Sequence, residues 1–266
     1  TAVSGGALAP RSRRGNTGQV ASYWSGGGGL SFMIATGGTE NIYIVDGITY
    51  KSHTFTSNSN FIVTQVGDIG TVDIHLIGGG GGGGYSYGGG GGGGGARTEV
   101  NAAVPATTYS VTIGGAGHQG QDIGVGWAGG AGGRTTIGGF TVGGGGAGTT
   151  NFQNGAGAPA DGGGGGGGNL NGIGASANGT YGSAGGGVNG GGGNGGSGYN
   201  QPNSYRTGSN ETRALGGYGS TANGFGAPAG GTSAGCGGGG GGIFNNVPYR
   251  GGNAVAGIVI VRYRIA

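Results

Sequence analysis

The sequence predicts an all-β protein without α-helix, in which a small β-sandwich-like domain carries a long inserted bundle of polyglycine II helices. Two observations lead to this fold class. Glycine accounts for 86 of the 266 residues, and much of it lies in nearly pure runs. The chain also closes with a strongly apolar strand pattern, AGIVIVRYRI at 256–265, whereas the other strand-like segments precede residue 143. The last strand has to pair with those segments, so the glycine-rich middle leaves and rejoins one β domain.

The glycine runs favour an ordered bundle over the alternative, a flexible linker. Pure glycine disfavours both α-helix and ordinary strand, but an extended helix with three residues per turn is open to it. The outward N–H and C=O groups of such helices can bond to neighbouring helices, which only glycine allows to approach so closely. Charged residues are only 7% of the chain, whereas disordered segments are usually richer in charge. The runs are residues 78–84, 88–95, 143–146, 162–168, 185–187, 190–193 and 237–242.

The predicted β domain covers residues 41–142 and is completed by the final strand. Its strand-like segments carry alternating or apolar side chains between turn residues. They are residues 41–45, 48–56, 60–66, 71–77, 108–113 and a hairpin at 134–142. Asp46-Gly47 is a hairpin signal between the first two. In the fourth, Val72, Ile74 and Leu76 share one face.

The rest of the chain divides into an N-terminal segment and the bundle. Residues 1–40 are interpreted as an attachment segment, with anchors at Tyr23-Trp24 and 30–34. Residues 143–255 contain no helix signal and no convincing strand, and are interpreted as the polyglycine II-rich bundle with recognition loops. The first runs of this bundle lie earlier, at 78–95.

Composition argues against several functional classes. The formal net charge is +3, and the arginines are too few and too dispersed for a nucleic-acid groove, so no nucleic-acid partner is expected. The cluster Arg11, Arg13 and Arg14 is either a solvated arm or a contact to an acidic partner. The lone Cys236 can form no intrachain disulfide and is read as a small apolar plug in the bundle. The sequence contains no run of about 18 apolar residues, so no membrane span is predicted.

Catalysis finds little support in the sequence. Only eight acidic residues occur, without motif-like spacing, and no Gly-x-Ser-x-Gly elbow or His/Cys metal cluster is present. His53, His75 and His118 are isolated from one another in sequence, and His75 is read as a satisfied histidine within a strand. We therefore expect a protein that is not an enzyme and uses no cofactor or metal.

The order of four segments carries a resemblance to a known family. YKSHTFTSNSNFIV is followed by VDIHLIGGGGGGG, by TTYSVTIGGAG and, after the glycine-rich middle, by GIVIVRYRI. Over residues 49–265 this order resembles the glycine-rich domain of bacteriophage tail fibre proteins. The polyglycine part is also similar to the receptor-binding adhesins at the tips of T-even-like long tail fibres. In those adhesins a sandwich of polyglycine II helices carries variable loops at its distal end.

The resemblance implies a tail fibre tip or fibre domain, located in the virion or otherwise extracellular, that binds a receptor on the bacterial cell surface. The receptor would be an outer-membrane protein or a surface polysaccharide. Other tail fibre or virion proteins are implied as partners, and a homo-oligomer is compatible with the sequence. By the same resemblance, the connections between glycine runs form the recognition surface. Its candidate receptor-binding residues are Tyr85, Tyr87, His118, Trp127, Phe152, Tyr181, Tyr199, Tyr205, Arg206, Arg213, Tyr218, Phe244 and Tyr249.

Two other interpretations stay open at this point, and a third finds no support in the sequence. The loop aromatics can instead cap the ends of the bundle and cover backbone that would otherwise be wet. The whole protein can be a structural virion decoration or an extracellular glycine-rich fibre without receptor specificity. An ice-binding bundle would need a flat face with regular Ala or Thr, and the bare, uneven runs show none.

Overall fold

A computed structural model describes residues 30–121, 127–150, 199–201, 205–220, 231–245 and 247–266. The chain divides into two compact units, Thr1–Ser31 and Phe32–Ala266, and all described strands belong to the second. Every regular element among the described residues is a β-strand, so the prediction of an all-β protein is confirmed there. The described residues contain no helix that is long and apolar enough to cross a membrane.

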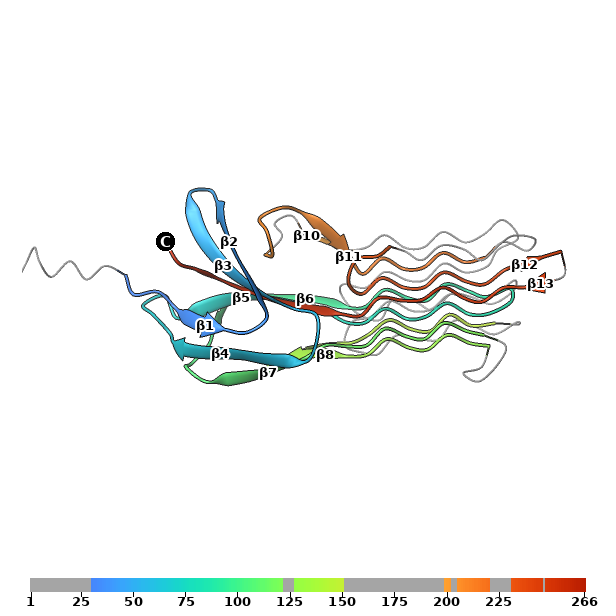
Figure 1. The fold of residues 1–266 in the computed structure, drawn as a ribbon, viewed down its shortest axis with the longest axis horizontal. Helices are drawn as coiled ribbons and strands as arrows, with labels where there is room; N and C mark the ends of the chain where they lie inside the picture. Colours follow the sequence, from blue (N-terminus) through green and yellow to red (C-terminus); the bar gives the residue numbers. More distant parts are fainter. Residues whose placement is uncertain (1–29, 122–126, 151–198, 202–204, 221–230, 246) are drawn as a thin grey trace, which may run out of the picture. The chain divides into compact units, whose positions relative to one another are not determined.

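Two five-stranded antiparallel sheets form a sandwich (Figure 1). Sheet 1 has the order β1-β4-β7-β8-β9, and sheet 2 has the order β2-β3-β14-β5-β6. The strands of sheet 1 are β1 (Ile34–Thr36), β4 (Ser59–Gln65), β7 (Thr108–Thr112), β8 (Thr135–Ile137) and β9 (Phe140–Val142). Those of sheet 2 are β2 (Thr39–Val45), β3 (Ile48–Phe55), β5 (Thr71–Ile77), β6 (Ala96–Ala103) and β14 (Ile258–Arg264).

The core lies between the two sheets and comes from alternate residues of their strands. Val72, Ile74 and Leu76 of β5 belong to it, as their predicted common face requires. Phe55 of β3 and Phe61 of β4 meet edge to face across the sheets, with ring centroids 6.3 Å apart. Edge-to-face rings add specific attraction to the burial of their apolar area. The prediction of a β-sandwich-like domain is confirmed.

The predicted hairpin and the predicted return of the chain are both confirmed. Asp46 and Gly47 have φ angles of 51° and 76°, the two consecutive positive values that a tight two-residue hairpin between β2 and β3 requires. Strand β14 pairs with β3 on one side and with β5 on the other. The last residues of the chain therefore occupy the centre of sheet 2.

Some elements differ from the prediction. Strand β1 and the start of β2 lie in residues 34–40, which were predicted to belong to the attachment segment. Strand β6 went unpredicted because ARTEVNAA is polar and rich in small residues, as suits an edge strand that bulges opposite β5. The expectation of no strand in 143–255 is wrong, because two short hairpins occur there. They are β10 (Tyr199–Gln201) with β11 (Glu211–Arg213), and β12 (Ile243–Phe244) with β13 (Val247–Pro248).

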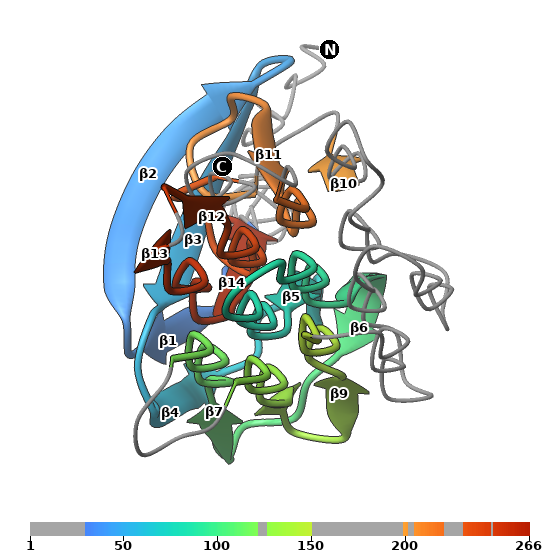
Figure 2. The ribbon, with the colours of Figure 1, turned by 90° about the vertical axis from the view of Figure 1, so that its right-hand side faces the viewer.

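Glycine-rich segments run on from the strands of the sandwich (Figure 1). They hydrogen-bond to one another with a period of three residues. The run 78–84, which continues β5, shows the period most clearly. Its amides, taken in order, donate to the carbonyls of Gly95, Gly133, Val255, Gly92, Gly130, Gly252 and Gly89 at 2.8–3.2 Å. Every third amide thus reaches the same neighbouring segment, as in an extended helix with three residues per turn. Seen end-on in Figure 2, the segments trace small triangular coils.

The same run is also surrounded by segments that donate to it. Its carbonyls accept from the amides of Gly117, Gly120, Gly145, Gly148, Gly238 and Gly241. The donors come from three segments that run parallel to it, and the acceptors of its own amides lie in three antiparallel ones. All seven amides and six of the seven carbonyls of the run are thus hydrogen-bonded to other backbone, which offsets the entropy cost of ordering glycine.

Close backbone approach explains why the run is pure glycine. A Cβ atom at Gly81, Gly82 or Gly83 would lie well under 3.0 Å from the carbonyl oxygen of Gly146, His118 or Gly239 respectively. Three successive positions of the run, each facing a different neighbouring segment, are therefore closed to side chains. At the periphery a Cβ on Gly115 would meet nothing within 4 Å, so a non-glycine residue fits at an outward position.

Cys236 was predicted to be a small apolar plug in the bundle. It is fully buried at the start of the segment 236–242, and its amide lies 3.2 Å from the carbonyl of Ser233. Burial raises the pKa of its thiol, which keeps the side chain neutral. The apolar role is consistent with this position.

His75 links the stability of sheet 2 to pH. The imidazole is fully buried, and its Nδ1 lies 2.9 Å from Oγ1 of Thr98. Burial and, to a lesser extent, the neighbouring positive charge of Arg213 together lower its pKa to about 3. Below the ordinary value of 6.5 the unfolded chain binds a proton that the folded chain does not. Stability is therefore complete above pH 6.5 and falls by about 1.4 kcal/mol per pH unit below it.

We expect urea unfolding at pH 5 to give about 2 kcal/mol less stability than at pH 6.5. His75→Gln keeps hydrogen-bonding capacity but cannot be protonated, so its stability should depend less on pH over this range. Burial also lowers the pKa of His53, so a smaller slope should remain in the variant. Equal slopes in the two proteins would contradict the assignment to His75.

Candidate functional site

Most of the predicted site residues that the structure describes fall into two separate places, the far end of the glycine bundle and the outer face of sheet 2. At the far end, the turn 85–87 connects the run 78–84 to the antiparallel run 88–95. Ser86 and Tyr87 both have left-handed backbones, with φ of 42° and 54°. Non-glycine residues rarely adopt this conformation, and two in succession cost free energy that the surrounding contacts must offset.

Backbone hydrogen bonds bring two other segments to this turn. The amide of Tyr85 donates to the carbonyl of Trp127 at 2.8 Å, and the amide of Ser86 donates to that of Tyr249 at 3.2 Å. These bonds extend the pattern of the 78–84 run, in which every third amide donates to the same neighbouring segment. Side chains from distant parts of the sequence therefore meet at the same level of the bundle.

The small hairpin β12–β13 completes the end of the bundle (Figure 1). Asn245 in its turn has a φ of 50°, and the amide of Tyr249 donates to the carbonyl of Gly242 at 2.8 Å. Phe244 and Val247 project from the hairpin with 38% and 55% of their surface exposed.

We call the side chains of Tyr87, Trp127, Phe244, Val247 and Tyr249 the tip surface. Trp127 is 49% exposed, Tyr87 and Tyr249 are half-buried, and none of the five carries a charge. Tyr85, which was also predicted as a site residue, is buried. Large rings held on backbone that is already hydrogen-bonded can contact a partner with little loss of conformational freedom.

His118 and Tyr218 lie on the sides of the bundle rather than at its end. The carbonyl of His118 accepts from Gly130, one three-residue step below Trp127, and its exposed ring lies against the backbone of Gly130. Tyr218 is 39% exposed, and its carbonyl accepts from Gly240. Phe152 and Tyr181 lie outside the described residues. The backbone of Tyr199 pairs with Arg213, and its side chain lies outside the described part.

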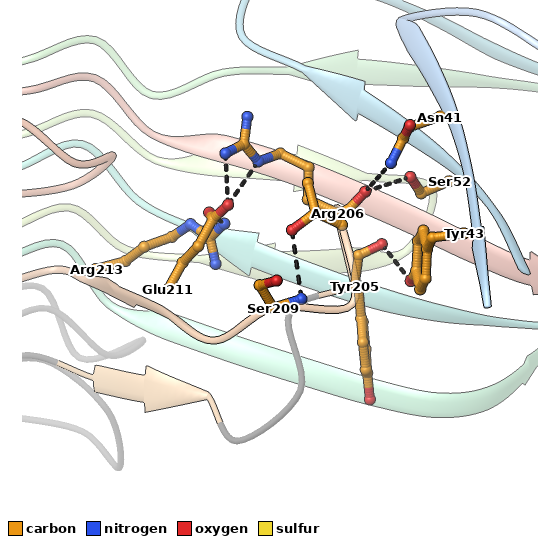
Figure 3. A network of polar contacts seen from close by, with 9 residues as sticks. Asn41, Tyr43, Ser52, Tyr205, Arg206, Ser209, Glu211 and Arg213 are labelled. Carbon is orange, nitrogen blue, oxygen red and sulfur yellow. Dashed lines mark hydrogen bonds and ion pairs between the residues drawn. The ribbon is translucent and has the colours of Figure 1, made fainter. Parts of the chain in front are cut away.

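Tyr205 and Arg206 are placed against sheet 2, and Tyr205 is only 7% exposed (Figure 3). The Tyr43 hydroxyl donates to the carbonyl of Tyr205 at 2.7 Å. The carbonyl of Arg206 accepts from Asn41 Nδ2 at 3.0 Å and from Ser52 Oγ at 2.9 Å. We call the segment of residues 205–206 the sheet clamp, because side chains of β2 and β3 hydrogen-bond to its backbone.

The ring of Tyr205 fills the outer face of the sheet. The guanidinium carbon of Arg262 lies 3.7 Å from the ring centroid, a close cation–π contact, and the ring meets His75 edge to face at 6.4 Å. Arg262 also donates to Asp73 at 2.9 Å. The ring of Tyr205 therefore contacts Arg262 and His75 on this face of β5 and β14, and Arg262 is in turn paired with Asp73.

Sequence reasoning did not separate the clamp from the tip surface, because both combine tyrosine with polar neighbours. The buried position of Tyr205 leaves little of it for a receptor, and Arg213 is buried as well. A usable signal was present in β14, where Arg262 follows a run of apolar residues and needs partners on the outer face. Within the described residues, no group of three or more His, Cys, Asp or Glu is placed to hold a metal ion.

Residues 56–264 match the family model of the glycine-rich domain. A comparison of the chain with curated proteins gave no match. The matched region begins in the turn after β3 and ends with β14, so it includes most of the sandwich together with the glycine-rich segments. It also covers well over half of the 266 residues. The chain belongs to the glycine-rich domain family.

Proposed function

We propose that this protein is a non-enzymatic recognition module in which a rigid bundle of polyglycine II helices displays the tip surface to a receptor. The three-residue rotation of hydrogen bonds and the closeness of the backbones support the polyglycine II assignment. A bundle bonded in this way resists bending, because every helix is tied to several others.

The observation that carries the proposal is the convergence of aromatic and apolar side chains from three separate segments at one end of the bundle. Tyr87, Trp127 and Tyr249 are connected there through main-chain hydrogen bonds of the turn 85–87. Because these bonds do not involve side chains, the side chains can vary without unfolding the scaffold. Binding surfaces typically have exposed aromatic side chains at their centre and charged residues only around the edge.

The resemblance to phage tail fibre proteins supports a specific setting for this module. We propose that it lies at the tip of a tail fibre or forms a fibre domain, with other virion proteins as structural partners. Its receptor would be an outer-membrane protein or a surface polysaccharide of a bacterium. A binding role needs no catalytic group at the tip, and the tip surface contains no acid, base or nucleophile other than tyrosine hydroxyls.

The experiment is binding of the purified chain to a panel of bacterial strains. We expect saturable binding to a narrow set of strains, and at least a tenfold loss of affinity in the double variant Trp127→Ala/Phe244→Ala. Both rings are substantially exposed, so the free energy of unfolding should change by no more than about 0.5 kcal/mol. Ile44→Ala is the matched control, since Ile44 is 69% exposed but lies on β2 in the sandwich.

Two results would overturn the proposal. A folded, monodisperse protein that binds no strain would favour a structural role in the virion or in an extracellular fibre. Equal loss of binding in the control and in the tip variant would show that the tip surface is not the contact. A tip variant that melts far earlier than the wild type would instead identify its rings as caps of the bundle.

A further inference from the structure

A cavity of about 330 Å³ lies beside the sheet clamp, between β11 and the segment that leads into β14. Its polar lining includes Arg206, Glu211, Arg213, Thr56 and Ser233. Val255, Ala256 and Ile258 contribute apolar wall. Its volume is at the lower end of the range for small-molecule sites, about 300–1,000 Å³.

Two guanidinium groups share one carboxylate at this cavity. Among the described residues that line it, Glu211 is the only acid, and it contacts both Arg206 and Arg213. Arg206 donates through Nε to Glu211 Oε1 at 2.9 Å and also contacts it through Nη2. Arg213 contacts Glu211 Oε2 through Nη2. Among the described lining residues, guanidinium groups thus outnumber carboxylates two to one in a partly enclosed space.

Arg213 has donor capacity that its neighbours do not use. Its side chain is only 3% exposed, and within the described residues its Nη1 has no hydrogen-bond partner. A buried donor that is left without an acceptor costs free energy, so an acceptor that reached Nη1 would be bound favourably. Burial and the nearby charge of Arg206 lower the pKa of Arg213 to about 10, as expected for a cation with too little negative charge around it.

We propose that this cavity binds a small molecule that carries a carboxylate or phosphate group. The oxyanion would take hydrogen bonds from the guanidinium groups of Arg213 and Arg206, for which such anions are the matching acceptors. The hydroxyls of Thr56 and Ser233 can donate further bonds. The apolar wall would contact the carbon skeleton of an organic ligand.

This site differs from the tip surface in position and chemistry, and it does not depend on the proposed function. The tip surface is uncharged and aromatic and is built on the turn 85–87. The cavity lies at the sheet end of the bundle and depends on β11. An anion could bind here whether or not the tip recognises a cell.

The test is calorimetric titration of the folded chain with inorganic phosphate and, separately, with glucuronate, at constant ionic strength. Neutral glucose serves as the control ligand for contacts that do not need charge. We expect saturable binding of one anion per chain, no binding of glucose, and a higher melting temperature with the anion. The two probes separate the sources of the oxyanion, since phosphate is tetrahedral and the carboxylate of glucuronate is carried on a sugar ring.

Three variants give effects of different sign. Arg206→Gln removes a guanidinium whose side chain is 46% exposed, and should weaken binding about tenfold. Glu211→Gln removes the competing carboxylate and should strengthen binding severalfold. Arg264→Gln removes the same net charge from an exposed position at the end of β14 and should leave binding unchanged.

Absence of saturable binding by both probes would overturn the proposal. It would also be overturned if Arg264→Gln weakened binding as much as Arg206→Gln, because the anions would then respond only to overall charge. If Glu211→Gln fails to fold, the comparison of Arg206→Gln with Arg264→Gln decides the matter alone.

Discussion

Gly82→Ala should destabilise the protein by about 3 kcal/mol or more, whereas Gly115→Ala should leave its stability unchanged or slightly higher. At Gly82 the added methyl would overlap the carbonyl group of His118, which belongs to backbone and cannot rotate away. At Gly115 the same methyl would meet nothing within 4 Å. Overpacking a rigid interior costs about 1–3 kcal/mol or more, and a compatible Gly→Ala change gains about 0.4–1 kcal/mol by restricting the unfolded chain.

The measurement is denaturant unfolding of the two variants beside the wild type, with the melting temperature as a second readout. The pair is matched, because both changes add one methyl group to the glycine-rich segments. A loss of less than 1 kcal/mol in Gly82→Ala would contradict close packing of the 78–84 run. A similar loss in both variants would mean that alanine disturbs the segments through backbone preference and not through contact.

Tyr205→Ala should cost about 3 kcal/mol, while Tyr218→Ala should change stability by no more than about 0.5 kcal/mol. Both tyrosines were predicted to bind a receptor, but only Tyr205 is buried, 7% against 39% exposed. Removing its ring opens a cavity on sheet 2 and takes the aromatic partner from Arg262, whose guanidinium lies 3.7 Å from the ring centroid.

Urea unfolding of both alanine variants tests this difference, with Tyr205→Phe as the control that keeps the ring. The phenylalanine variant should retain most of the stability, since the packing and the cation–π contact need only the ring. If Tyr205→Ala proved as stable as Tyr218→Ala, the sheet clamp would contribute nothing to the fold. Tyr205 would then return to the set of candidate receptor contacts.

The sandwich could be predicted from the sequence because its strands carry their own local signals. Apolar and polar side chains alternate in residues 71–77, as in a half-buried strand. Asp46-Gly47 marks the turn between β2 and β3, where two successive positive φ angles are needed. The final strand was informative for a different reason. Nothing near AGIVIVRYRI in sequence can cover it, so a long-range pairing was required, and β14 shows that pairing with β3 and β5.

Other elements lacked such signals. Strand β6 takes its conformation from pairing with β5 and not from its side chains, and hairpins of two or three residues per strand are too short to show a period. The peripheral glycine segments did contain an overlooked regularity. Gly114, Gly117 and Gly120 are buried every third residue, while Gly115 and His118 between them are exposed. A period of three in glycine therefore indicates a segment at the edge of the bundle, and an unbroken run indicates one that is surrounded.

The candidate site was only partly predictable. The turns that form the tip surface could be located, since they interrupt glycine runs and contain rings. Composition could not show that Trp127 and Tyr249 meet at Ser86 and its neighbours, because that contact depends on how the segments pack side by side. It also could not show that Tyr205 is turned inward, as its partners Tyr43 and Arg262 are far from it in sequence.

The proposed function needs the tip side chains to be held in place and to be free to vary without unfolding the protein. Both conditions require that the 78–84 run be a rigid, hydrogen-bonded scaffold and not a linker. Amide hydrogen exchange over residues 78–84 tests this most directly. We predict exchange slowed at least about a thousandfold relative to an unstructured glycine peptide, comparable with the central strands β5 and β14. Complete exchange within the mixing time, while β5 and β14 stay protected, would contradict the account and describe a sandwich with a flexible glycine linker.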